Sequence, residues 1–134
     1  MPGIYGPDRS AIERVRSGAA HRMDLPDQVF SRIHVDDLAA GVVAGLAAPP
    51  GAYNLADDRP ASQNAVIEEA CRLLGVEPPP LRSLEDAGLS PQARAFYAEN
   101  RRVANGKAGR VLGWSPRFAD YRAGLRDCLT RSSP

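Results

Sequence analysis

The extended segments of this sequence are too few and too short to build a self-sufficient parallel sheet. Short runs that are typical of strands stand at residues 1–7, 28–34, 51–56 and 81–84. Between them, apolar residues recur at helical spacing, most clearly from 35 to 46. A doubly wound fold needs five or six strands that alternate with helices. The sequence therefore predicts connectors and outer helices without the central sheet that such helices cover.

Local capping signals mark where the helices begin and end. Ser10 and Glu13 form the pattern of a capping box, which predicts a helix over residues 11–17 that ends at Gly18. Further helices are predicted over residues 36–48, 62–75, 90–99, 105–113 and 118–129. All of them are short, which agrees with a content of 12 glycines and 12 prolines.

The helix that begins near Asp36 has the clearest amphipathic spacing. Its apolar positions are Val35, Leu38, Ala39, Val42, Val43 and Leu46. Asp36 and Asp37 are placed to cap this helix and to complement its dipole. The alternative is a metal or acid–base cluster, since His34 and Asp36 share a face in an extended segment. Two ligands are too few for a typical zinc site, so no metal site is predicted.

Composition agrees with a single domain of ordinary globular character. The chain has 134 residues, of which 43% are hydrophobic and 25% charged, with a net charge of +1. The basic residues within 101–110 are interpreted as solvated surface, so no nucleic-acid partner is expected. The weakly polar run over 38–50 is too short to span a bilayer, and no leader pattern is visible. We therefore expect a cytoplasmic protein without a membrane partner, in which Cys71 and Cys128 are buried free thiols.

Four segments in a fixed order carry a family signature. They are PGIYGP (2–7), SRIHVDDLA (31–39), GAYNLADDRPAS (51–62) and NGKAGRVLGWSPRFADYRAGL (105–125). Together they resemble the C-terminal half of an extended or atypical short-chain dehydrogenase/reductase, and more narrowly the NAD-dependent epimerase/dehydratase type. The resemblance implies an α/β fold, helix-rich with a few short strands, which is the C-terminal part of an NAD(P)-binding Rossmann-type fold without its central dinucleotide-binding sheet. It also implies that residues 1–134 are one partial domain of an enzyme about twice as long.

The catalytic pair of the family, a tyrosine followed four residues later by a lysine, is absent from the sequence. Lys107 is the only lysine among 17 basic residues, and Val103 stands four residues before it. The dinucleotide loop is absent as well. Gly106, Gly109 and Gly113 follow no buried strand, so they predict a small-residue helix that ends at a glycine rather than a phosphate-binding turn.

The resemblance also implies remnants of a cofactor site. Pro2, Gly3 and Ile4 match the family segment that passes beside the nicotinamide, although an ordinary strand exit explains them equally well. NAD or NADP is expected in a full-length relative, without tight binding to this chain alone. Relatives that act on nucleotide sugars usually carry Asn at the position of Gly3 and often Arg at the position of Phe30. Both are absent here, which puts a nucleotide-sugar substrate in doubt.

The candidate substrate-binding residues are Tyr5, Arg9, Arg32 and His34. The two arginines suit an anionic group, and solvated surface arginines are the alternative. The expected function is the substrate-binding C-terminal portion of an NAD(P)-dependent oxidoreductase or epimerase-like protein, truncated and inactive by itself. Its partners would be a small-molecule substrate and a second copy or a separate N-terminal half. The alternative is a small non-catalytic interaction or dimerisation module derived from such an enzyme. The excess of Arg and Ala suggests a bacterial source.

Overall fold

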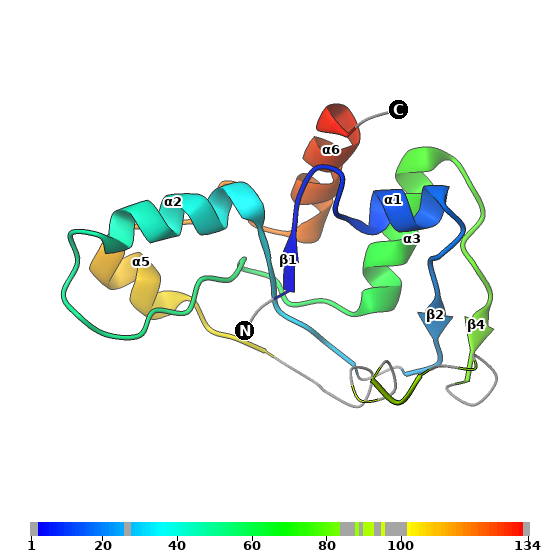
Figure 1. Ribbon diagram of the computed structural model, residues 1–134, viewed down its shortest axis with the longest axis horizontal. Helices are drawn as coiled ribbons and strands as arrows, with labels where there is room; N and C mark the ends of the chain where they lie inside the picture. The colour runs from blue at the N-terminus through cyan, green and yellow to red at the C-terminus, as the bar shows by residue number, and fades with distance from the viewer. Residues whose placement is uncertain are drawn as a thin grey trace.

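The computed structural model describes residues 3–25, 28–83, 88, 90–92, 95 and 102–132. Its helices and strands are short and are joined by long connectors (Figure 1). In chain order they are β1 (Gly3–Tyr5), α1 (Ala11–Arg16), β2 (Arg22–Met23), β3 (Arg32–His34), α2 (Val35–Gly45), α3 (Gln63–Leu74), β4 (Leu81–Arg82), α5 (Gly106–Leu112) and α6 (Tyr121–Arg131). The helix predicted over 90–99 lies mostly outside the described residues.

The described strands form two parallel pairs rather than one sheet. β1 pairs with β3, and β2 pairs with β4. The strands predicted within 1–7, 28–34 and 81–84 are therefore present, while β2 was not predicted. The strand predicted over 51–56 is wrong. That segment is irregular, and the residue that follows it, Asp57, donates its N–H to the Arg32 carbonyl of β3 at 2.8 Å.

Two hydrophobic clusters lie on the two sides of the β1–β3 pair. The larger one joins α1, α3 and α6 through the fully buried Ile12, Ile67 and Leu125. The smaller one joins Ile33 of β3 to Ala108 and Trp114, and α2 packs there through its inner side. Figure 1 shows β1 between these two groups, with α2 and α5 on one side and α1 and α3 on the other.

The capping signals predicted for α1 and α3 are confirmed. Ser10 and Glu13 form the complete capping box of α1, and the Glu13 carboxylate accepts from the Ser10 N–H at 2.7 Å. The Ser62 hydroxyl accepts from the Ala65 N–H at the start of α3. Gly75 ends α3 in the left-handed region with φ of 70°, which favours glycine. Local chemistry thus fixes these ends of α1 and α3.

Helix α2 turns its apolar face outward. Val42, Val43 and Leu46 are 57%, 67% and 82% exposed. The inner side of α2 packs closely against Leu55, because a Cβ on Gly41 would lie 2.5 Å from the Leu55 side chain. Such a face usually covers a core, and within the described residues it covers none.

Cys71 and Cys128 are buried free thiols, as predicted. Burial raises the pKa of the Cys128 thiol to about 11 and that of Cys71 above its usual value. No helix in the described part of the chain is long and apolar enough to cross a membrane.

Candidate functional site

One face of the β1–β3 pair carries polar side chains into the protein. Tyr5 lies opposite His34 in the parallel register, and Arg32 stands two residues before His34. Because side chains alternate along a strand, these three point to one face, while Ile33 points to the other. We call Tyr5, Arg32 and His34 the polar face. The fourth candidate substrate-binding residue, Arg9, lies instead on the exposed turn after β1.

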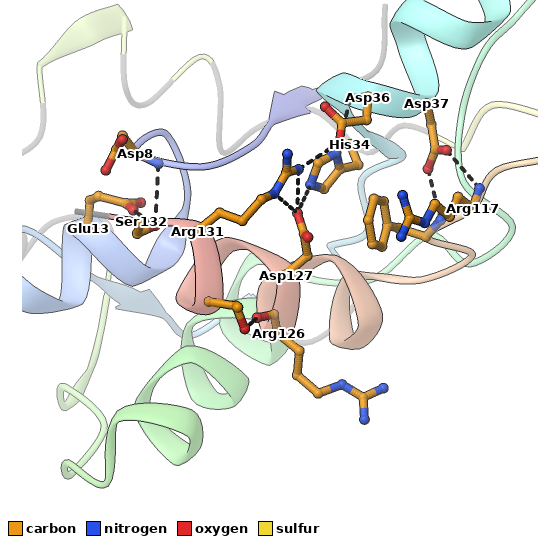
Figure 2. Close-up of polar contacts among 12 residues, drawn as sticks. Asp8, Glu13, His34, Asp36, Asp37, Arg117, Arg126, Asp127, Arg131 and Ser132 are labelled. Atoms are coloured by element: carbon orange, nitrogen blue, oxygen red, sulfur yellow. Dashed lines mark hydrogen bonds and ion pairs between the residues drawn. The ribbon is translucent and has the colours of Figure 1, made fainter. Parts of the chain in front are cut away.

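Both ring nitrogens of the fully buried His34 are engaged (Figure 2). Its Nδ1 accepts from the Asp36 N–H at 3.1 Å, which makes His34 the N-cap of α2. The remaining proton therefore sits on Nε2, which donates to Asp127 Oδ2 at 2.9 Å. The Tyr5 ring meets the imidazole edge-on at 5.3 Å, and the Phe118 ring lies 4.2 Å away. His34 is thus held from every side by the chain itself.

Arg131 completes an ion-pair network around His34. Its guanidinium donates to Asp36 Oδ2 and to Asp127 Oδ2, each at 2.6 Å (Figure 2). Burial alone would raise the pKa of Asp127, but the hydrogen bonds from Arg131 and His34 hold that pKa below its usual range. The network joins the start of α2 to the end of α6. The predicted capping role of Asp36 is wrong, because the His34 ring takes the capping position and Asp36 pairs with Arg131.

The same cluster is the group of potential metal ligands in the described part of the chain. Donor atoms of His34, Asp36 and Asp127 all lie within 4.8 Å of one another. A divalent cation would have to displace the Arg131 guanidinium from both carboxylates and the proton from His34 Nε2. The geometry therefore favours an ion-pair network, and the absence of a metal site stays a prediction.

Asp37 also does not cap α2, contrary to the prediction. It is 3% exposed, and its two carboxylate oxygens accept from the backbone N–H groups of Arg117 at 2.7 Å and Phe118 at 3.0 Å. Its carbonyl accepts from the Trp114 indole N–H at 3.0 Å. Asp37 thus fixes the segment that places the Phe118 ring against His34.

A second buried polar group lies beside the polar face. Asp57 is 2% exposed, and burial raises its pKa to about 7 although the Arg32 charge opposes the shift. Burial, and then the charge of Asp57, raises the pKa of Tyr5, while burial lowers that of Arg32. In the described structure the Tyr5 hydroxyl, Arg32 Nη1 and Asp57 Oδ2 are buried without a hydrogen-bond partner. Asp57 and Asp127 were missed by the sequence analysis, because only the fold brings them to β3.

Known proteins are similar to this chain over part of their own, longer chains. A 3-diazoavenalumate denitrifying reductase from a Streptomyces species is 31% identical over 91% of this chain and 43% of its own length. A conserved protein of unknown function from Silicibacter pomeroyi matches all of this chain with a TM-score of 0.90 and 38% identity, over 48% of its length. A dTDP-glucose 4,6-dehydratase from Bacillus anthracis, solved with NAD, matches 96% of the chain at a TM-score of 0.69 and 16% identity, over 41% of its length. The chain spans less than half of each.

No protein-family model matches the chain. The solved structures decide its fold, since epimerases and a dehydratase recur among them over 40–44% of their lengths. This chain has the fold of the C-terminal part of an NAD-dependent epimerase/dehydratase-type enzyme. The resemblance drawn from the four sequence segments is thereby confirmed. So is the α/β class with many helices and few short strands.

The candidate cofactor residues lie along β1. Gly3 is exposed, and its N–H donates to the Ser31 carbonyl at 3.1 Å. Ile4 is half-buried against the smaller core cluster, and Pro2 lies outside the described residues. Their assignment to a cofactor stays a prediction.

The only lysine of the chain has a structural role. Lys107 Nζ donates to the Ala52 carbonyl at 2.8 Å and lies 4.7 Å from the centroid of the Tyr53 ring. It thereby holds α5 against the 51–53 segment. The glycines around it behave as predicted, with a helix that ends at Gly113, whose φ is 65°. They form no phosphate-binding turn.

Proposed function

We propose that this chain is the substrate-binding part of an NAD(P)-dependent oxidoreductase or epimerase-type protein and does not turn over substrate by itself. The fold match to less than half of longer enzymes carries the proposal. Structures similar to the chain include complexes with NAD and with NADPH. The sequence holds neither the tyrosine–lysine pair nor the glycine-rich loop, so both must come from elsewhere.

The positions of the polar side chains suggest which of them contact the substrate and which support the structure. Arg9 is exposed on the turn after β1, so it is the residue that we assign to an anionic group of the substrate. The polar face (Tyr5, Arg32 and His34) supports this turn and β3 from the inside of the protein. Gly3 and Ile4, with Pro2 before them, are assigned to the edge of the cofactor site. A bound NAD(P) would supply the hydride chemistry, and these residues would orient the substrate.

A chimera tests the proposal. The part of the S. pomeroyi protein that this chain does not match is joined to this chain through a linker. We expect the chimera to bind NADH or NADPH, measured by nucleotide fluorescence, and this chain alone to show neither binding nor turnover. Turnover by the purified chain, or a folded chimera that binds neither nucleotide, would contradict the proposal.

We also propose a bacterial cytoplasmic setting, supported by two free cysteines in a reduced state. A second candidate function is a non-catalytic interaction or dimerisation module. The exposed apolar side of α2 favours it, because faces of this kind mark contact surfaces. Light scattering on the chain alone distinguishes the two. A stable dimer that melts cooperatively favours the dimerisation module. A monomer without a cooperative melt favours the substrate-binding part of a longer enzyme.

A further inference from the structure

Three polar atoms at the polar face are buried without being satisfied by the chain. They are the Tyr5 hydroxyl, Arg32 Nη1 and Asp57 Oδ2, and none has a hydrogen-bond partner within the described structure. Arg32 is only 8% exposed and Asp57 only 2%. Burial of such groups costs free energy unless each of them bonds to something, and buried polar groups in proteins are nearly always bonded. The three atoms therefore call for a common explanation.

The backbone brings the three side chains to one place. Tyr5 and Arg32 point to the same face of paired strands and are two positions apart in the register, within the reach of long side chains. Asp57 lies beside them, because its N–H donates to the Arg32 carbonyl at 2.8 Å. After burial, the charge of Asp57 has the largest effect on the pKa of both Tyr5 and Arg32, which agrees with this proximity.

Backbone groups hold the other ends of the two charged side chains. Arg32 Nη2 donates to the Ala61 carbonyl at 3.0 Å, and Asp57 Oδ1 accepts from the Arg59 N–H at 3.1 Å. These bonds fix each side chain through one atom. They leave a donor, Arg32 Nη1, and an acceptor, Asp57 Oδ2, for a molecule that bridges them.

The start of α6 encloses this site. Gly124 packs so closely on the Tyr5 hydroxyl that a Cβ there would overlap it. The Asp58 N–H donates to the Ala119 carbonyl, just before the helix, at 2.9 Å. A site that is enclosed in this way suits a molecule of the smallest size.

The charges of the site favour a neutral occupant that both donates and accepts. The positive charge of Arg32 is offset by Asp57 when that carboxyl is ionised. Burial raises the pKa of Asp57 to about 7, so both of its forms are present near neutral pH. Water matches either form, because it donates to a carboxylate and accepts from a protonated carboxyl.

We propose that one water molecule is bound here, accepting from Arg32 Nη1 and bonding to the Tyr5 hydroxyl and to Asp57 Oδ2. Buried waters in proteins typically make about three hydrogen bonds to polar groups that the chain leaves unsatisfied. This water joins β1, β3 and the segment that leads into α3. It completes the support that the polar face gives to the strand pair, and it is independent of the proposed function.

A high-resolution crystal structure of this chain tests the site directly. We expect one ordered water within hydrogen-bonding distance of the Tyr5 hydroxyl, Arg32 Nη1 and Asp57 Oδ2. A direct bond between Arg32 Nη1 and Asp57 Oδ2, or a site without density for a bound molecule, would overturn the proposal.

Urea unfolding of Tyr5→Phe tests the same water in solution. A hydroxyl that bonds to the water stabilises the fold, so its removal is expected to raise the unfolding equilibrium constant roughly fivefold. A buried hydroxyl without a partner is costly instead. Tyr5→Phe would then leave the constant unchanged or lower it, and that result would contradict the proposal. Tyr53→Phe is the matched control, because its hydroxyl donates to the Pro49 carbonyl at the surface, and it should change the constant by less than about twofold.

Discussion

The α1–α3–α6 side of the molecule and the α2–α5 side meet at the β1–β3 pair, but they differ in how completely they are packed. On the first side, Ile12, Ile67 and Leu125 are at most 1% exposed. On the second side, Val42 of α2 and Leu46 at its C-cap are more than half exposed. The chain thus packs the first side fully by itself, whereas apolar side chains stay exposed on the second.

The largest effect on stability is expected when one leucine on each side is replaced by alanine. Leu125→Ala should lower the free energy of unfolding by about 4 kcal/mol, because it removes a fully buried side chain and leaves a cavity. Leu46→Ala, at 82% exposure, should change it by less than about 0.5 kcal/mol. Urea unfolding of the chain measures both. Equal losses would show that the two sides do not differ in this way.

A smaller effect is expected from Asp57, whose backbone N–H bonds to β3, where the two sides meet. Its folded pKa of about 7 exceeds the ordinary value of 3.8, so the stability that its protonated form provides is full below pH 4 and is lost as the pH rises toward 7. We expect the free energy of unfolding to fall by about 3 kcal/mol between pH 4 and 7 on account of this group. Asp57→Asn should flatten the profile, whereas the exposed neighbour Asp58→Asn should keep it. A profile that both variants share would contradict the assignment.

Glycine-to-alanine substitutions sharpen the same comparison. A Cβ on Gly124 would lie 1.7 Å from the Tyr5 hydroxyl, so Gly124→Ala should cost about 2 kcal/mol through overpacking. A Cβ on Gly45, at the end of α2, would have no neighbour within 4 Å. Gly45→Ala should be neutral or stabilise by up to about 1 kcal/mol, because alanine favours helix. Thermal melts decide the matter, and a loss at Gly45 as large as that at Gly124 would remove the contrast.

Local signals in the sequence were sufficient for the ends of α1 and α3 and for the missing catalytic pair. Ser10 and Glu13 are three residues apart, and a tyrosine that pairs with Lys107 would stand four residues before it. Both patterns can therefore be recognised within a few neighbouring positions of the sequence. The site depends on distant pairs instead. His34 meets Asp127 across 93 positions, and Asp37 holds Phe118 across 81. No spacing rule connects such residues, which is why the sequence suggested Asp37 as a helix cap and gave Asp127 no role.

The smallest expected effect lies in the turn between β1 and α1. Asp8 has a φ of 63°, in the left-handed region where side chains other than glycine are strained. Its backbone N–H donates to the Ser132 hydroxyl at 3.4 Å, an interaction that glycine would keep (Figure 2). Asp8→Gly should therefore raise the free energy of unfolding by about 0.5 kcal/mol.

Gly18→Ala, at a φ of 75°, is the reverse test on the same side and should lower the free energy of unfolding by about 1 kcal/mol. Opposite signs in paired urea titrations would show that backbone strain, and not the aspartate charge, governs this turn. A loss on Asp8→Gly would instead assign the side chain a stabilising contact that outweighs the strain.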